Sequence, residues 1–307
     1  MMYMKKSMIL SVLLMTGYVA QAQTVQLRIN PIEGQTCTME NQVISNTNQS
    51  FMGQEITAIS TMKTQVHFEV NSVGETTFEM TAYYVDLFMT VESQGQKISY
   101  EVEGKDEVSM AFKALLNKPF QVSMDKRSGK VIKIEGAEAA FAEVEEALAP
   151  LSRAKRRTAM DAAKPVGEGG IKNCAESSFA NYPENALKTG QAWMRRDTSL
   201  VENMGGRVFS DSQNKLVSFD TEKAEVTHMG MMQTDPDNAP AMQNGAEVSL
   251  QMGGSQSGKA IIDLATGWIL ESTSTAALSG SAEANMQGNS MNIPIKITIE
   301  SVVKRLE

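Results

Sequence analysis

The sequence predicts a mainly β protein: a curved antiparallel sheet or open barrel made of two duplicated halves, with helices packed on the concave side. Three observations predict this fold class. Apolar and polar residues alternate with a period of two over long stretches, one turn motif occurs in both halves, and amphipathic helical segments interrupt the first half. Long strands with one polar face favour an antiparallel sheet, because parallel sheets are buried on both faces.

The strand pattern is clearest between residues 24 and 102. Val66 and Phe68 alternate with polar neighbours. In the next strand, apolar residues keep one phase from Phe78 to Tyr84 and the opposite phase from Val85 to Val91. A β-bulge changes the face of a strand in this way, so we expect a bulge where the two phases meet.

Two helical segments are expected, at about 106–116 and 137–162. Asp106 is suited to cap the first segment, and Pro150 ends or kinks the second. The basic cluster from Arg153 to Arg157 is either a solvated surface or a docking site for an anionic headgroup or partner.

The chain is expected to divide into two halves. The N-terminal half covers residues 23–163 and the C-terminal half, of antiparallel strands, covers residues 190–307. Between them, residues 164–189 begin with several glycines and a proline, which favours an irregular connection.

A shared turn motif indicates the duplication. Residues 124–132 and 262–270 both contain an apolar residue, Asp, two variable residues, a hydroxyl residue and Gly, followed by aliphatic positions. Asp accepts hydrogen bonds from turn amides and Gly adopts a positive φ, so each motif is expected to close a hairpin. Each half also opens on a Gly-Gln pair, at Gly34 and at Gly190.

Residues 1–22 have the organisation of an export signal. Lys5 and Lys6 precede an apolar run, and the run ends at Ala20-Gln21-Ala22, with small residues at the cleavage positions. The run is too short for a permanent transmembrane helix. We therefore expect a mature protein without a transmembrane anchor, in the periplasm or at the outer envelope or outside the cell. There, Cys37 and Cys174 either form a disulfide or stay as two buried thiols.

The composition argues against several classes of function. The net charge of −8 disfavours a nucleic-acid partner, and two His with two Cys disfavour a structural zinc site. We expect His67 and His228 to face solvent, which leaves little for a Ser/His or Cys/His mechanism. No phosphate-binding Gly loop with its Lys is found. We therefore expect no enzyme activity and no cofactor.

Methionine is the unusual residue, with 22 in the chain. Its flexible side chain either fills gaps in a core or lines a cavity for apolar ligands of varied shape. The candidate ligand-binding residues are Met80, Met89, Met110, Phe112, Leu115, Phe120, Met124, Phe141 and Met252. Because thioethers are soft ligands, an alternative is Cu(I) binding by His228, Met229, Met231 and Met232.

The chain resembles an uncharacterised family of exported Bacteroidota proteins that is known as a domain of unknown function. The resemblance is carried by residues 115–120, 129–136, 182–183, 190–193 and 261–268. These motifs are structural, so the resemblance implies a fold and no activity. More loosely, the expected curved sheet is similar to that of periplasmic lipoprotein carriers, a likeness of fold and not of function.

The sequence therefore predicts an exported, non-enzymatic protein that binds an apolar or lipid-like ligand in the cell envelope. An envelope structural or protein-interaction module with a packed core is the main alternative, and Cu(I) binding is the third. A ligand-binding role predicts a cavity lined by Met, Leu and Phe. A partner-binding role predicts a contiguous exposed apolar patch.

Overall fold

The computed structural model describes residues 23–51, 53–179, 182–201, 206–243, 246–286 and 289–306. The expected export signal, residues 1–22, lies outside the described residues. The strands are β1 (Thr24–Val25), β2 (Thr36–Phe51), β3 (Gln54–Val73), β4 (Thr77–Ser93), β5 (Gln96–Glu101), β6 (Phe120–Asp125), β7 (Val131–Glu135), β8 (Leu187–Lys188), β9 (Ala192–Val201), β10 (Gly206–Phe219), β11 (Lys223–Thr234), β12 (Ala241–Gln243), β13 (Ala246–Asp263), β14 (Ile269–Met286) and β15 (Asn289–Leu306). The helices are α1 (Glu107–Leu115), α2 (Ala137–Leu148), α3 (Arg153–Ala163) and α4 (Glu168–Ser177), with a 3₁₀ turn at Lys164–Val166.

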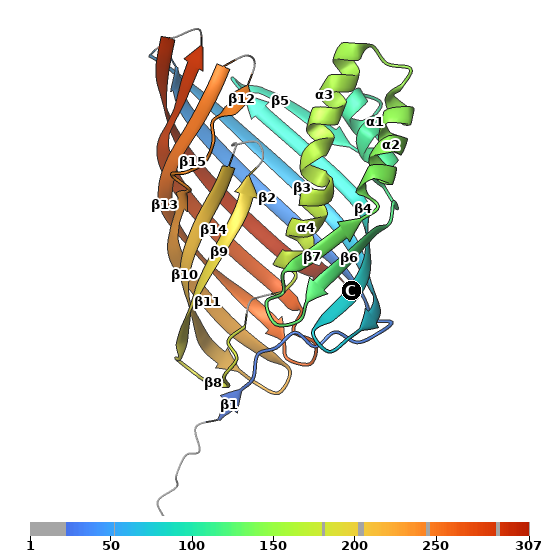
Figure 1. Cartoon of the computed structure of the whole chain (residues 1–307), viewed down its shortest axis with the longest axis vertical. Coiled ribbons are helices and arrows are strands. Elements are labelled where there is room, and N and C mark those ends of the chain that lie inside the picture. Colours follow the sequence, from blue (N-terminus) through green and yellow to red (C-terminus); the bar gives the residue numbers. More distant parts are fainter. Residues whose placement is uncertain are drawn as a thin grey trace, which may run out of the picture.

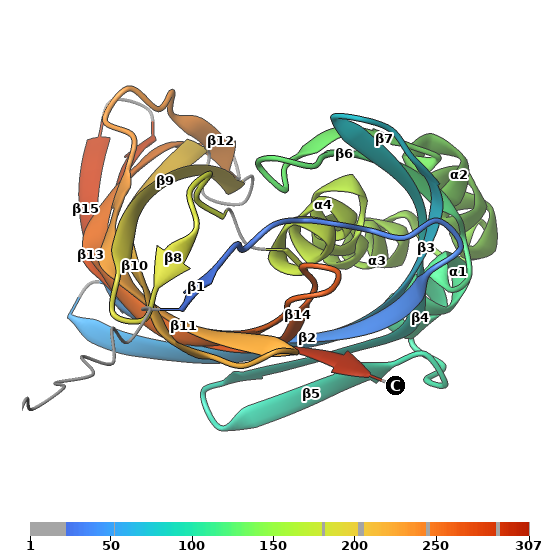
Figure 2. The ribbon, with the colours of Figure 1, turned by 90° about the horizontal axis from the view of Figure 1, so that it is seen from below.

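Thirteen strands form one sheet, in the order β7-β6-β4-β3-β2-β15-β14-β13-β11-β10-β9 with β5 added to β4 and β12 to β13. The separate pair β1–β8 lies near one end of the molecule (Figure 1). Neighbouring strands are antiparallel, and β7 and β9 are the two edges of the open sheet. Figure 2 shows the sheet curving around α3 and α4. The expected mainly β fold with an open, curved antiparallel sheet is confirmed.

The helices lie with the N-terminal half of the sheet. α1 packs against α2 and α3. Asp106 caps α1 as expected, because its Oδ1 accepts hydrogen bonds from the backbone N of Val108 at 3.0 Å and of Ser109 at 2.9 Å. The expected helix at 137–162 forms as two helices, α2 and α3. Ser152, two residues after Pro150, caps the second with its side chain.

Beyond the two expected helical segments, the described residues contain a further helix, α4, in the connection at 164–189. Ile171 and Cys174 are on its buried side. Gly170 allows α4 to approach the sheet closely, since a Cβ at this position would lie 2.6 Å from the Tyr84 hydroxyl oxygen. Gly170, one of the glycines that suggested a loop, is therefore used for close packing of a helix.

The expected bulge is found on β4. Gln65 of β3 pairs with Asp86, whereas the next residue, Val66, pairs with Tyr84. Val85 is therefore the extra residue. The bulge keeps the apolar residues on both sides of it facing the core, which explains the change of phase in the sequence.

The two halves begin with the same hydrogen bonds. The Gly-Gln pair at 34–35 exchanges two backbone hydrogen bonds with Val70, and the pair at 190–191 exchanges the same two with Leu216. The register between β3 and β4 then shifts directly after Val70, and the register between β10 and β11 shifts directly after Leu216. This shared detail supports an internal duplication.

The expected hairpins are also confirmed. Asp125 closes the β6–β7 turn and Asp263 closes the β13–β14 turn, each by accepting a hydrogen bond from the backbone N two residues ahead, at 3.1 and 2.9 Å. Gly129 and Gly267 have φ of 65° and 81°. Both motifs therefore use the Asp acceptor and the left-handed Gly that the pattern predicts.

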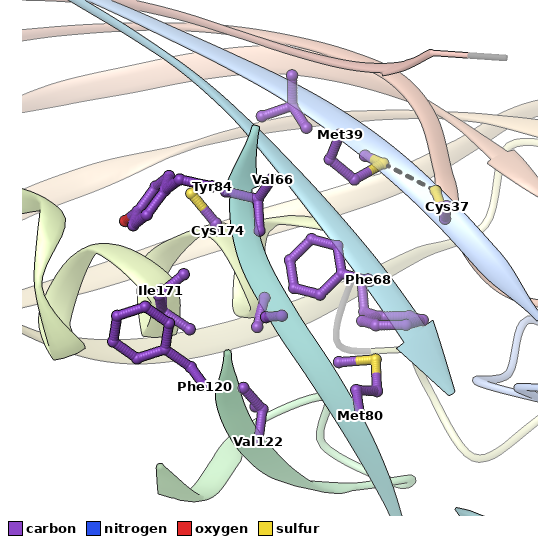
Figure 3. Close-up of a cluster of buried hydrophobic side chains, with 14 of the residues drawn as sticks. Cys37, Met39, Val66, Phe68, Met80, Tyr84, Phe120, Val122, Ile171 and Cys174 are labelled. Atoms are coloured by element: carbon purple, nitrogen blue, oxygen red, sulfur yellow. Dashed lines mark hydrogen bonds between the residues drawn. The ribbon is translucent and has the colours of Figure 1, made fainter. Parts of the chain in front are cut away.

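The main core lies between the helices and the inner face of the N-terminal strands (Figure 3). Cys37 and Cys174 are buried in it as free thiols, so the disulfide that the sequence left open does not form. Cys37 pairs in register with Phe68, whereas the Cys174 sulfur lies 3.7 Å from the Thr64 hydroxyl. Phe68 and Thr64 are about 13 Å apart along β3. Cys37 and Cys174, which lie beside them, are therefore too far apart for a disulfide.

Trp268 joins the two halves. It lies in the β13–β14 turn, yet its side chain is fully buried. The centroid of its ring is 4.3 Å from that of Phe179, which follows α4, and 5.8 Å from that of Phe68 on β3.

In the described residues, no helix is long and apolar enough to cross a membrane.

Replacement of Trp268 tests this junction. Trp268→Ala should lower the free energy of unfolding by about 3–5 kcal/mol, because it leaves a large cavity between both halves. Trp268→Phe should cost less. Urea unfolding followed by circular dichroism measures both, with Ile132→Ala at an exposed site as the control. An unchanged unfolding midpoint in Trp268→Ala would contradict the assignment.

The thiols provide a second test. Burial raises the pKa of Cys37 and of Cys174 to about 11, so both stay protonated and shielded at pH 8. Ellman's reagent should label neither thiol in the folded protein, and both thiols after denaturation without reductant. Fewer than two thiols in the denatured protein would show that a disulfide forms.

Candidate ligand-binding site

A hollow of about 200 Å³ lies inside the curve of the sheet, between the end of α4 and the C-terminal strands. We call it the inner hollow. Its polar lining residues are Glu176, Ser177, Trp193, Arg195, Asn214, His228, Ser272, Ser274 and Ser301. Its apolar lining residues are Phe179, Val226, Ala260, Ile262, Ile269 and Val303. One small space is therefore bordered by both hydrogen-bonding groups and apolar surface.

A polar row crosses three neighbouring strands in this hollow. Trp193 of β9 pairs with Asn214 of β10, and Asn214 pairs with His228 of β11. Paired residues share a face of the sheet, so all three point inward. Trp193 Nε1 and Asn214 Nδ2 are buried, and neither has a hydrogen-bond partner in the described part of the chain. Buried donors usually have acceptors, so these two are suited to contact a bound molecule.

The position of His228 corrects an expectation, since we expected both His to face solvent. Burial, and then the charge of Arg195, lower the pKa of His228, so its ring is neutral at pH 7. His67 lies on the outer face, with its Nδ1 2.9 Å from the Thr38 hydroxyl oxygen. The two imidazoles therefore cannot act together.

Charged side chains connect the two edges of the sheet beside the inner hollow. Lys130 Nζ lies 3.0 Å from Glu176 Oε2 and 3.1 Å from Asp197 Oδ1. Arg195 forms an ion pair with Asp197, and Glu176 Oε1 accepts a hydrogen bond from the Val131 backbone N at 3.1 Å. Two cations therefore face two carboxylates, so the network is electrically balanced. It holds β9 next to β7 and α4.

Beyond the inner hollow, the inner face of β14 and β15 is apolar. We call this surface the apolar inner stripe, and it consists of Ala276, Leu278, Ala282, Ile293, Ile295, Ile297 and Ile299. These residues are buried or half-buried, whereas their neighbours Lys296, Thr298 and Glu300 are exposed on the other face. The main contacts between helices and sheet are on β4, β5 and β7. Figure 1 shows α1, α2 and α3 on the side of β3 and β4, away from β13 to β15, whereas the end of α4 meets the start of β14 at the inner hollow.

A second hollow, of about 750 Å³, lies on the outer face of the C-terminal half. Met194, Met229 and Met231 line it and are 70%, 65% and 63% exposed. We call it the outer methionine groove. It is an exposed apolar patch of the kind that the partner-binding hypothesis predicts.

The strand geometry corrects the Cu(I) hypothesis. His228 and Met232 point to the inner face of β11, whereas Met229 and Met231 point to the outer face, because side chains alternate along a strand. The four residues therefore cannot converge on one ion. In the described residues, no group of three or more His, Cys, Asp or Glu is arranged to hold a metal.

The candidate ligand-binding residues lie elsewhere. Met80, Phe112, Leu115, Phe120 and Met124 are fully buried in the main core. Met89, Met110 and Phe141 are partly buried and pack against that core, and Met252 is buried on β13 outside it. None of the nine lines the hollows described here. The eight residues in or against the main core therefore serve its packing, whereas Met252 pairs with Gly280 of β14.

The basic cluster forms a surface hollow of its own. Arg153, Arg156 and Arg157 line a space of about 440 Å³ together with Leu148 and Met160. Arg157 is paired with an acidic residue of the same helix, Asp161, at 3.6 Å. Three guanidinium groups and two apolar side chains therefore border the same surface hollow.

Sequence patterns did not identify the polar row. Asn214 follows Ser210 and Ser212 at every second position of β10, so the alternating pattern contains these residues. In the sequence, however, a polar side of a strand looks like a solvent-facing side. Only the fold shows that this side faces inward.

Comparison with known proteins gives one family match. A model described as a family of unknown function, DUF6263, matches residues 75–269. This agrees with the resemblance inferred from the sequence, whereas the Bacteroidota origin stays a prediction. No curated protein matches the chain.

Several solved structures are similar at low TM-scores. DynF from the dynemicin biosynthesis pathway of Micromonospora chersina is 9% identical, with a TM-score of 0.20 and coverage of 92% of this chain and 85% of that one. Pseudomonas aeruginosa OccK5 (OpdH) is 8% identical, with a TM-score of 0.24 and coverage of 90% and 99%. Salmonella typhi OmpF in complex with daunomycin is 7% identical, with a TM-score of 0.23 and coverage of 91% and 100%. These likenesses are too weak to bear on function.

Proposed function

We propose that this chain, which belongs to the DUF6263 family of unknown function, is an exported, non-enzymatic protein that binds an apolar or lipid-like ligand. The proposal is based on the geometry of the chain itself. The observation that carries the proposal is the apolar inner stripe. Its isoleucines face the inside of a curved sheet, yet the main helix contacts lie on the other half. A concave apolar surface next to a few polar groups is typical of ligand sites.

The proposal moves the ligand from the N-terminal core to the C-terminal half. In the N-terminal half, α1 to α4 and the strands form one packed core, and side chains such as Phe112 and Met80 are fully buried. A ligand there would have to displace the core. In the C-terminal half, Leu278, Ile293, Ile295 and Ile299 remain partly accessible. Burial of this surface by a ligand would supply about 25 cal/mol per Å².

Export and the lack of catalysis are parts of the same proposal. The leader-like residues 1–22 support export to the periplasm or the outer envelope. His67 and His228 lie on opposite faces of the sheet, so the two imidazoles cannot act together in catalysis, which supports a binding role.

Organic extracts of the purified protein, expressed with its own leader, should contain a co-purifying apolar molecule that mass spectrometry detects.

A charge placed on the stripe tests the ligand site. We expect the double variant Leu278→Lys, Ile295→Lys to weaken binding of N-phenyl-1-naphthylamine, an uncharged fluorescent probe, by at least about tenfold, because the bound probe would desolvate the ammonium groups. Fluorescence titration measures the affinity.

The matched control is Asn285→Lys, which places a lysine on the exposed outer face of β14, away from the outer methionine groove. It should leave binding unchanged. A folded double variant that binds the probe as tightly as the wild type would rule out the stripe as the ligand site.

The outer methionine groove favours a second function, binding of an extended apolar segment of an envelope protein. Met194 and Met229 lie on the outer faces of β9 and β11, in register through Gln213 of β10, so an extended apolar segment laid across these strands would contact both. Flexible methionines suit such a contact.

Photo-crosslinking tests this second function. A photo-reactive residue at Met231 should give one discrete adduct in intact cells, whereas the same residue at the distant exposed position Ile98 should give none. Equal labelling from both positions, or from neither, would contradict a specific partner at the groove.

A further inference from the structure

We propose that the inner hollow receives the polar end of the ligand, and that this end is an uncharged oxygen acceptor, as in an ester, an alcohol or an amide, and not a carboxylate. This inference rests on the proposed function, because the apolar inner stripe would hold the rest of the same molecule.

The hollow and the stripe are continuous along two paired strands. Ser274 and Ser301 are register partners that line the hollow. The next inward pair along these strands is Ala276 and Ile299, the first pair of the stripe. One step of two residues, about 7 Å, therefore separates the polar space from the apolar surface. A molecule with one polar end and an apolar chain fits this order.

The donors of the polar row require an acceptor. Asn214 is only 9% exposed, and its Nδ2 and the Trp193 Nε1 are buried without a partner among the described residues. Both groups can only donate through these atoms. They belong to neighbouring strands in direct register, so one oxygen of a ligand can approach both. An oxygen acceptor is therefore the complementary group.

The charges around the hollow favour an uncharged acceptor. Lys130 contacts both Glu176 and Asp197, and Arg195 is paired with Asp197. These cations are therefore already matched by carboxylates. His228 adds no positive charge, because its ring is neutral above its lowered pKa. A ligand carboxylate would bring an unmatched negative charge next to Glu176, at a site of reduced solvation where like charges repel strongly.

Two ligands with the same acyl chain separate the alternatives. 1-Monoolein presents an uncharged ester and hydroxyls, and oleate presents a carboxylate. We expect 1-monoolein to displace N-phenyl-1-naphthylamine from the wild-type protein at pH 8 at about tenfold lower concentration than oleate. If neither displaces the probe, the proposed function fails. If both displace it equally, or oleate is the better ligand, the proposed function stands and the uncharged-acceptor assignment is overturned.

Removal of the negative charge of Glu176 should improve the binding of oleate. Glu176→Gln keeps an acceptor oxygen for the Val131 backbone N but removes one negative charge from the hollow. Oleate should then bind about tenfold more tightly, while 1-monoolein should change little. An unchanged affinity for oleate would contradict the charge argument.

Donor variants complete the test. Asn214→Leu and Trp193→Phe each remove one buried donor and should weaken 1-monoolein binding without affecting the uncharged probe, which has no oxygen to accept a hydrogen bond. Gln251→Leu, at an exposed position on the outer face of β13 and away from the outer methionine groove, is the matched control. Trp193→Phe keeps an aromatic ring in place, so it tests the donor even if Asn214→Leu does not fold. Unchanged selectivity in a folded donor variant would overturn the role of the polar row.

Discussion

The burial of Trp268 between the two halves is the interaction on which the rest of the structure depends. Its ring belongs to a turn of the C-terminal half but packs on Phe68 and Phe179 of the N-terminal half and its helical extension. The neighbouring Gly267 carbonyl accepts a hydrogen bond from the Tyr182 hydroxyl at 2.8 Å. These contacts fix the end of α4 against the C-terminal strands, and therefore define one wall of the inner hollow.

The two halves begin from the same plan and differ in what covers their inner faces. Both have the Gly-Gln opening, the register shift after Val70 or Leu216 and the Asp-Gly turn. After its Asp-Gly turn, the N-terminal half continues into helices that pack on its strands, whereas the C-terminal half continues into the long strands β14 and β15. As a result, one inner face forms a packed core and the other leaves an apolar stripe with partly accessible side chains. This asymmetry is the structural basis of the proposed binding function.

The balanced network around Lys130 links architecture and site. It ties the edge strand β9 to β7 and α4 across the opening of the sheet, and it also surrounds the polar row. Ion pairs of this kind contribute little stability when they are exposed. Here they are partly buried, so their effect on the charge of the inner hollow matters more than their effect on folding.

The sequence by itself determined the features that depend on residues close together in the chain. These local features are the alternation of apolar and polar residues along each strand, the bulge at Val85, the cap at Asp106 and the Asp-Gly turns. Each is set by hydrogen bonds or sterics within a few residues. Only the tertiary structure decided which side of each strand faces inward. For this reason the polar row and the apolar inner stripe could not be predicted, and core residues such as Phe112 were expected to line a cavity. Burial depends on the surface that folds against a residue, and that surface often comes from the other half of the chain.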